Sequence, residues 1–308
     1  MTDKYWKLGI IGWPLGYSLS PLIHERALEH AGLKGEYREY PVKPEELWGW
    51  LEQVPALRLS GFNITMPYKK SVFAWLVGQG MGRLGRPESW LRPSEAAPVV
   101  ISESPEAAIG AINTVVMEQG RPVGYNTDGE GFLRPLLELP RCLDLTGWHV
   151  LLLGAGGAAE AIAISLALQT KAGRLTIWNR HPDRAKELAQ KLNPLRRGGN
   201  FAFAAKTLSA LPVEECQLLV NATPVGMNGP NEKLVDSARL RKGQWVYDLV
   251  YEPRETVLIR AARQRGCQVI TGDEMLAGQG AAAFELWTGV KGMLPVMREA
   301  LDEHFRSR

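Results

Sequence analysis

Residues 150–159 read VLLLGAGGAA, four large apolar residues followed by a cluster of glycines and alanines. The apolar run predicts a buried strand, and the G-x-G-x-x-A pattern after it predicts a tight turn into a helix. Gly154 permits the turn, Gly156 lets the backbone approach a pyrophosphate, and the small Ala159 lets helix and strand pack closely. The alternative is a simple tight turn without a ligand. We predict a dinucleotide site whose phosphate-contacting residues are Gly154, Ala155, Gly156, Gly157 and Ala158.

The end of the next predicted strand bears on the choice between NAD and NADP. The strand Leu175–Trp178 runs into NRHPDR, with no carboxylate at its end to bond a ribose 2′-hydroxyl. Two guanidinium groups follow instead, and their planar forks suit a 2′-phosphate. The alternative is that Arg180 and Arg184 are ordinary surface charges and that Asp183 pairs with one of them. We predict NADP as the cofactor, held here by Asn179, Arg180 and Arg184.

Beyond residue 128 the sequence alternates between strand and helix patterns, which predicts a parallel sheet covered on both faces. The predicted strands are His149–Leu153, Leu175–Trp178, Phe201–Ala204, Leu218–Asn221, Trp245–Leu249 and Gln268–Ile270. The predicted helices are Gly157–Leu168, Pro182–Leu192 and Thr256–Arg265. Residues 128–270 are therefore expected to form a Rossmann-like NADP-binding domain.

The first half also alternates between strand and helix patterns, which predicts a second α/β domain. Strands are expected at Lys7–Gly12, near Tyr37–Val42 and near Phe62–Ile64, followed by a hairpin of Ala111–Glu118 and Pro122–Thr127 around Gln119–Gly120. Helices are expected from Ser20, with its hydroxyl as N-cap, from Pro44 and around Pro67. Residues 78–108 have no steady period and predict an irregular excursion. The tail Glu274–Phe305 is expected to be helical, interrupted near Pro295, so that residues 271–308 return to the domain of residues 1–127.

Composition excludes several classes of protein. A net charge of +3 over 308 residues gives little support for nucleic-acid binding. Cys142, Cys216 and Cys267 are far apart and lack CxxC spacing, so we expect neither a disulfide framework nor a metal site. The N-terminus has no leader pattern, and the apolar stretch Val150–Leu168 contains Glu160 and the glycine cluster, which argues against a membrane span. We expect a cytoplasmic monomer or homodimer that acts on a small molecule.

Polar residues that could carry chemistry lie mainly between the apolar runs of the first half. Each has an ordinary structural explanation: Ser20 and Asp128 could cap helices, and Lys69 could be one more exposed lysine. The full set is Ser18, Ser20, Asn63, Thr65, Lys69, Asn113, Thr114, Asn126, Thr127, Asp128, Tyr251 and Gln279.

Taken together, these segments resemble the shikimate dehydrogenase family, in that family's order and over nearly the whole chain. The segments that carry the resemblance are Gly12–His24 (GWPLGYSLSPLIH), Gly61–Lys69 (GFNITMPYK), Gly110–Thr114 (GAINT), Gly124–Gly131 (GYNTDGEG), Gly154–Ala159 (GAGGAA), Asn179–Arg184, Asn221–Met227 (NATPVGM), Tyr247–Thr256 (YDLVYEPRET) and Gly272–Gly289 (GDEMLAGQGAAAFELWTG).

The resemblance implies an oxidoreductase that reversibly reduces 3-dehydroshikimate to shikimate with NADPH, a reaction of aromatic amino acid (chorismate) biosynthesis. It implies Lys69 and Asp128 as the catalytic pair. The implied substrate residues are Ser18 and Ser20 for the carboxylate, with Tyr251 nearby, and Thr65, Asn113, Asp128 and Gln279 for the ring hydroxyls, while Asn63 would be structural. The implied cofactor residues, besides the glycine turn and the arginines, are Ala222, Thr223, Leu249 and Gly272.

The implied chemistry is reasonable for these residue types. Hydride delivery to a ketone leaves a developing alkoxide, which needs a positive donor and then a proton. A lysine ammonium can supply both. A carboxylate such as that of Asp128 would orient Lys69 and hold a substrate hydroxyl.

Three positions depart from the family pattern. Trp13 and Tyr17 stand where Asn and His are usual near the carboxylate serines, and His181 replaces a usual Thr beside the adenosine phosphate.

Three other interpretations stay open: a quinate/shikimate dehydrogenase that uses NAD, a non-catalytic sensor of shikimate-like ligands, and another Rossmann enzyme such as a folate-type dehydrogenase. The last would explain the glycine turn but not the paired serines with GFNITMPYK.

Overall fold

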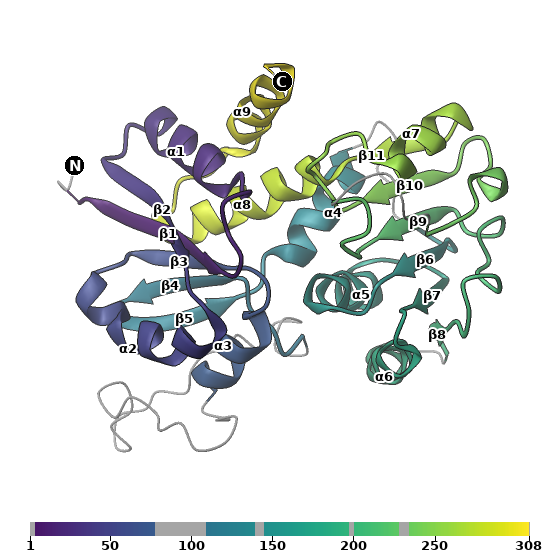
Figure 1. Cartoon of the computed structure of the whole chain (residues 1–308), viewed down its shortest axis with the longest axis horizontal. Coiled ribbons are helices and arrows are strands. Elements are labelled where there is room, and N and C mark those ends of the chain that lie inside the picture. The colour runs from purple at the N-terminus through teal and green to yellow at the C-terminus, as the bar shows by residue number, and fades with distance from the viewer. Residues whose placement is uncertain (1–3, 78–108, 139–144, 197–199, 228–233, 308) are drawn as a thin grey trace. The chain divides into compact units, whose positions relative to one another are not determined.

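The computed structural model describes residues 4–77, 109–138, 145–196, 200–227 and 234–307 (Figure 1). By contacts between residues, the chain divides into two compact units: Met1–Thr127 together with Gln279–Arg308, and Asp128–Gly278. Helix α8 (Gly272–Thr288) contributes residues to both units. The α/β fold class with two sheets is confirmed.

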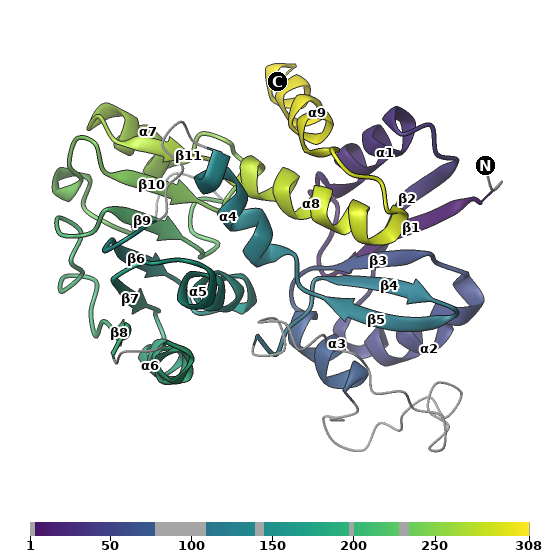
Figure 2. The same cartoon turned by 180° about the vertical axis from the view of Figure 1, so that it is seen from behind.

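The first unit is built on a mixed five-stranded sheet of order β2-β1-β3-β4-β5 (Figure 2). Strand β1 pairs in parallel with β2 and β3, whereas β4 is antiparallel to both of its neighbours. The strands are β1 (Trp6–Gly12), β2 (Gly35–Pro41), β3 (Gly61–Ile64), β4 (Thr114–Glu118) and β5 (Arg121–Tyr125). The helices are α1 (Ser20–His30), α2 (Leu47–Leu57, after a 3₁₀ turn Pro44–Glu46), α3 (Lys69–Leu76) and α9 (Leu294–Arg306).

One apolar cluster of the first unit lies between its sheet and helices α2 and α3. Leu51 of α2, Phe62 of β3 and Val72 of α3 are fully buried in it. Trp50 meets the Phe62 ring edge-on, with the ring centroids 5.3 Å apart. Because β1 and β3 run parallel, both strands end at the same edge of the sheet, and the polar residues that follow them are brought together there.

The second unit is built on a parallel six-stranded sheet of order β11-β10-β9-β6-β7-β8. Its strands are β6 (His149–Leu153), β7 (Arg174–Trp178), β8 (Ala202–Ala204), β9 (Leu218–Asn221), β10 (Trp245–Asp248) and β11 (Gln268–Ile270). Its helices are α4 (Asp128–Glu138), α5 (Gly157–Gln169), α6 (Pro182–Leu192), α7 (Val257–Gln264) and the start of α8. This is the doubly wound order, which binds dinucleotides at the carboxyl ends of the strands where the order reverses, here between β6 and β9.

Most predicted elements are confirmed. Strands His149–Leu153, Leu218–Asn221 and Gln268–Ile270 and helix Pro182–Leu192 have the predicted bounds. The hairpin is also confirmed, with Gln119 and Gly120 at positive φ in its turn, but β4 begins at Thr114 rather than Ala111. The C-terminal helices are interrupted between Thr288 and Leu294. The excursion predicted for residues 78–108 lies outside the described residues.

The predicted N-cap of the first helix is wrong. Leu19 occupies that position, and Ser20 is already helical and buried. The Ser18 hydroxyl accepts a hydrogen bond from the Ser20 N–H, at 3.2 Å. Proline tolerates any first-turn position of a helix because those N–H groups lack helical partners, so the Ser-Pro pair did not determine the starting residue. The third helix, expected to begin around Pro67, begins at Lys69.

Neither a membrane-spanning helix nor a metal site is found among the described residues. Within these ranges no helix combines the length and the apolar character that crossing a membrane requires. In the same part of the chain, no cluster of three or more His, Cys, Asp or Glu side chains is placed to hold a metal ion.

Candidate active site and nucleotide site

Asn113 is the centre of a buried hydrogen-bond network in the first unit. Its Oδ1 accepts from the Thr127 N–H at 2.8 Å and from the Thr114 hydroxyl at 3.1 Å. Its Nδ2 donates to Thr127 Oγ1 at 3.0 Å and to Gln279 Oε1 at 3.2 Å. The fold thus brings together Asn113 and Gln279, two predicted partners of the ring hydroxyls, from segments far apart in the chain.

Asn63 anchors this network to the sheet. Its Nδ2 donates to the Asn113 carbonyl oxygen at 3.1 Å and to Thr114 Oγ1 at 3.0 Å. Its Oδ1 accepts from the Tyr37 hydroxyl at 2.7 Å. Both ends of the amide are therefore engaged within the protein, which agrees with the structural role expected for Asn63.

Tyr37, which donates a hydrogen bond to Asn63, belongs to a cluster of stacked aromatic rings. The His24 and Tyr37 rings stack with centroids 4.5 Å apart, and Trp287 lies 5.2 Å from His24. Burial lowers the pKa of His24 to about 3, against a smaller opposing effect of a hydrogen bond with Asn63. Burial also raises the pKa of Tyr37 well above its usual range. Both side chains are therefore neutral at physiological pH, and this cluster carries no charge.

Ser18 and Ser20 lie at the start of helix α1. Ser18 is half-buried and Ser20 is buried, and the helix has no side-chain cap at its first residue. The first N–H groups of a helix favour negative charge, and two adjacent hydroxyls add further donors. This arrangement suits the carboxylate that the family resemblance implies for these serines.

Thr65 and Lys69 follow β3, at the edge where β1 also ends. The Thr65 N–H donates to the Ile11 carbonyl oxygen at 2.9 Å. A Cβ added at Gly12 would lie 2.4 Å from Thr65 Cγ2, so only glycine lets the end of β1 approach this residue. The Lys69 carbonyl oxygen accepts from the Ile112 N–H at 3.1 Å, which ties the start of α3 to the residue before Asn113.

The glycine turn of the second unit fits a dinucleotide pyrophosphate. Gly154 has φ +119°, and a Cβ there would lie 2.7 Å from the Ala222 carbonyl oxygen. A Cβ added at Gly156 would have no atom within 4 Å, so its backbone faces open space. Gly156 is also the N-cap of α5 and offers no side chain to the first N–H groups of that helix. Those N–H groups can therefore bind phosphate oxygens.

The two predicted arginines follow β7. Arg180 and Arg184 are exposed, and Asn179 Oδ1 accepts from the His181 N–H at 2.9 Å, which shapes the turn. Within the described residues, neither guanidinium forms an ion pair with Asp183 or another carboxylate. Both guanidinium groups are consequently available to a phosphate ligand.

The remaining predicted cofactor residues lie after β9 and β10. Ala222 and Thr223 follow β9 directly, and Leu249 follows β10. A Cβ added at Gly272 would lie 2.4 Å from the Leu249 carbonyl oxygen, so the start of α8 is in contact with the end of β10. Gly154 likewise approaches Ala222, so the segments after β6 and β9 are also in contact at the carboxyl edge of the sheet.

Asp128 and Tyr251 complete the predicted set. Asp128 is the first residue of α4 and is 1% exposed, and Tyr251 is half-buried in the loop after β10. Both belong to the second unit, whereas Lys69 belongs to the first. The pairing of Lys69 with Asp128 stays a prediction.

Sequence reasoning missed the polar residues that support the loop after β10. Asp248 and Thr256 are buried and hydrogen-bonded to each other at 2.6 Å. Arg254 forms an ion pair with the buried Asp273 at 2.8 Å. The available signal was a carboxylate at the end of an otherwise apolar strand, since such a residue is seldom buried without partners.

Comparisons with known proteins agree with this description. Three family models match: the shikimate dehydrogenase substrate binding domain over residues 10–77, shikimate/quinate 5-dehydrogenase over 139–223, and the shikimate 5′-dehydrogenase C-terminal domain over 272–301. The shikimate dehydrogenase (NADP⁺) of Moorella thermoacetica is 38% identical over 304 residues, 96% of this chain and 92% of that protein.

Two solved structures are similar over nearly the full chain. A shikimate dehydrogenase in complex with NADP⁺ has a TM-score of 0.81 and 32% identity, with 99% of this chain and 97% of the other covered. The Thermus thermophilus shikimate 5-dehydrogenase, in complex with NADP(H) and shikimate, has a TM-score of 0.76 and 35% identity, with 97% and 99% covered.

Proposed function

This chain belongs to the shikimate dehydrogenase family, and on that premise we propose that it catalyses the reversible NADPH-dependent reduction of 3-dehydroshikimate to shikimate. The reaction is a step of aromatic amino acid (chorismate) biosynthesis. The structural observation that carries the proposal is the network in which Asn113, Thr127 and Gln279 are joined. Amide and hydroxyl groups suit the hydroxyls of a cyclic polyol, and a ring hydroxyl would take the place of an intramolecular partner such as the one that joins Asn113 to Gln279.

The substrate residues have complementary roles in this proposal. Ser18 and Ser20 bind the carboxylate from the start of α1, and Tyr251 adds a hydroxyl to the same group. Thr65, Asn113, Asp128 and Gln279 bind the ring hydroxyls. Asn63 holds the backbone carbonyl of Asn113, while the Thr127 N–H and the Thr114 hydroxyl hold the oxygen of its side-chain amide, so the amide is oriented by the protein itself.

The cofactor residues lie in the second unit. The turn at residues 154–158 holds the pyrophosphate, Arg180 and Arg184 hold the 2′-phosphate beside Asn179, and Ala222, Thr223, Leu249 and Gly272 line the nicotinamide end. When bound there, NADPH supplies the hydride.

Lys69 and Asp128 carry the proton chemistry. As hydride reaches the carbonyl carbon, the Lys69 ammonium stabilises the charge that develops on the carbonyl oxygen and donates a proton from Nζ to it. The Asp128 carboxylate accepts a hydrogen bond from a ring hydroxyl of the substrate. Oxidation of shikimate reverses the step, with the Lys69 amine as the base.

We propose that residues 1–127 with 271–308 form the substrate domain and residues 128–270 the NADP domain. Asp128 and Tyr251 of the NADP domain also contact the substrate, and Gly272 of the substrate domain also contacts the cofactor. We also propose a cytoplasmic location, supported by the free, buried thiols of Cys216 and Cys267. A monomer or a homodimer fits the proposal equally, and sedimentation equilibrium would distinguish them.

A four-way assay tests the proposed function. Shikimate and quinate are each offered with NADP⁺ and with NAD⁺, and the reduced nicotinamide is followed by its absorbance. The expected result is highest kcat/KM for shikimate with NADP⁺. Preference for quinate or for NAD⁺ would favour the broader quinate/shikimate dehydrogenase, and no turnover by protein that binds shikimate would favour a sensor.

A further inference from the structure

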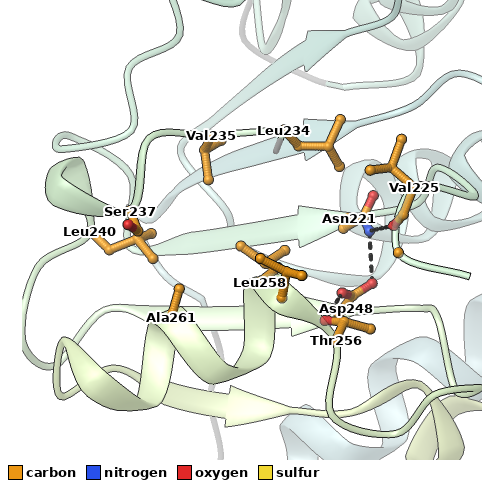
Figure 3. Close-up of a pocket in the computed structure, with 12 residues that line it drawn as sticks. Asn221, Val225, Leu234, Val235, Ser237, Leu240, Asp248, Thr256, Leu258 and Ala261 are labelled. Carbon is orange, nitrogen blue, oxygen red and sulfur yellow. Dashed lines mark hydrogen bonds between the residues drawn. The ribbon is translucent and has the colours of Figure 1, made fainter. Parts of the chain in front are cut away.

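Asp248 connects the two loops that reach the nicotinamide end of the proposed cofactor site. It is fully buried at the end of β10. Its Oδ1 accepts hydrogen bonds from Asn221 Nδ2 at 2.8 Å and from the Val250 N–H at 3.1 Å. Its Oδ2 accepts from the Thr256 hydroxyl at 2.6 Å (Figure 3). One carboxylate thus binds the end of β9 and both ends of the loop 249–256.

Asn221 extends this connection into the segment after β9. Its Oδ1 accepts from the Thr223 N–H at 3.0 Å and from the Thr223 hydroxyl at 2.7 Å. Its Nδ2 donates to the Val225 carbonyl oxygen at 3.1 Å as well as to Asp248. Asp248 is therefore one of the two acceptors that orient the Asn221 amide, and that amide in turn shapes residues 221–225.

Thr256 extends the connection on the other side. Its hydroxyl donates to Asp248 and accepts from the Ile259 N–H at 3.1 Å, as the N-cap of α7. A hydroxyl has one proton, so the acceptor at Asp248 determines that Thr256 presents its lone pairs to the helix. The loop between Val250 and Thr256 carries Tyr251 and is held at both ends.

The surroundings of Asp248 indicate a role beyond packing. An apolar pocket that includes Val225, Leu240 and Leu258 lies beside the carboxylate (Figure 3). Burial raises the pKa of Asp248 to about 6, although hydrogen bonds from Thr256, Val250 and Asn221 act in the opposite direction. A buried carboxylate costs free energy that an apolar residue of similar size would not, so stability alone does not account for it.

We propose that Asp248 is a positioning residue for hydride transfer: it sets the positions of Ala222, Thr223 and Leu249 against the nicotinamide without touching the substrate. This inference rests on the proposed function, because it assigns those three residues to the nicotinamide end. The adenosine end, with Arg180 and Arg184, lies beyond β7 and shares no hydrogen bond with Asp248 among the described residues.

The test separates the two ends of the cofactor. Adenosine 2′,5′-bisphosphate is the probe for the adenosine end, measured by calorimetry, and kcat for NADPH-dependent reduction reports on the nicotinamide end. In Asp248→Ala we expect kcat to fall roughly 10²-fold, the effect of a small misplacement of reacting groups, with the probe Kd changed less than about twofold. Asp248→Asn keeps an oxygen for Asn221 and Val250 but has no second acceptor for the Thr256 hydroxyl, so it should recover only part of that loss.

Thr256 offers a matched pair that does not depend on the folding of an Asp248 variant. Thr256→Val removes the hydroxyl at nearly constant volume and should lower kcat, whereas Thr256→Ser retains it and should recover most of the activity. Cys216→Ala is the stability control. Cys216 is buried just before β9 begins, at the end of the strand opposite to Asn221. It should lower the unfolding temperature without changing kcat.

Each outcome decides the proposal. Unchanged kcat in folded Asp248→Ala, or equal kcat in the two Thr256 variants, would overturn it. Weakening of the probe in parallel with kcat would also overturn it, because that pattern means general loss of the folded unit. Absence of turnover in the unsubstituted protein would instead refute the proposed function.

Discussion

Protonation of His24 should make the first unit less stable in mild acid. His24 is 1% exposed, stacked on Tyr37, and its pKa is lowered by burial to about 3 from the ordinary 6.5. Between these two values the unfolded chain binds a proton that the folded chain does not. The stability contribution is therefore fully present above pH 6.5 and is lost progressively as pH falls toward 3.

The size of the effect follows from that difference. Each pH unit between the two pKa values changes the free energy of unfolding by about 1.4 kcal/mol, so lowering the pH from 7 to 5 should remove about 2 kcal/mol through His24. Carboxylates and other histidines contribute as well. A comparison with a variant that has no titratable side chain at position 24 isolates the part of the pH-dependent change in unfolding free energy that comes from His24.

The assay is urea unfolding at pH 7 and pH 5 of the unsubstituted protein, His24→Phe and His30→Gln. The phenylalanine keeps an aromatic ring for the stack but has no titratable nitrogen, and His30 is an exposed histidine of the same helix. The loss of stability on acidification should be smaller in His24→Phe by about 2 kcal/mol and nearly unchanged in His30→Gln. If His24→Phe does not fold, an NMR titration of the unsubstituted protein tests directly whether His24 stays neutral in the folded state between pH 7 and pH 5.

Equal pH dependence in all three proteins would refute the reasoning. So would an NMR titration in which His24 becomes protonated between pH 7 and 5 in the folded state. Either result would mean that the ring is solvated or paired with a negative group, contrary to its apolar neighbours Phe284 and Trp287.

Three further predictions concern the proposed sites and the fold that supports them. Lys69→Ala should lower kcat by roughly 10²-fold with a smaller change in KM, and a near-normal kcat would remove Lys69 from the role of acid. Arg180→Ala should raise KM for NADPH much more than for NADH in steady-state kinetics; equal effects would contradict the 2′-phosphate contact. The Arg196 guanidinium donates hydrogen bonds to the carbonyl oxygens of Ala167, Thr170 and Ala172, at the end of α5 and just after it. Arg196→Ala should therefore lower the free energy of unfolding by about 1–3 kcal/mol, measured by chemical denaturation. An unchanged denaturation curve would show that these hydrogen bonds do not stabilise the fold.

The Rossmann-like half could be predicted because its signals are local. The turn at Gly154 and Gly156 depends on residues next to each other, and a strand such as His149–Leu153 is apolar at nearly every position because both of its faces are buried. The helix Pro182–Leu192 has a proline in its first turn and a clear apolar stripe. Such patterns determine backbone conformation within a few residues, so they can be recognised without knowledge of distant contacts.

The sequence by itself determined the identity of the candidate residues and the order of the helices and strands, since both follow from short-range pattern and resemblance. Only the tertiary structure decided which polar groups meet: Asn113 with Gln279, Asn63 with Tyr37, and Asp248 with Asn221 and Thr256. It also showed that Ser20 lies inside the helix rather than at its cap. A hydrogen bond between residues distant in the chain leaves no spacing pattern in the sequence, because its partners are brought together only by the pairing of strands and the packing of helices upon them.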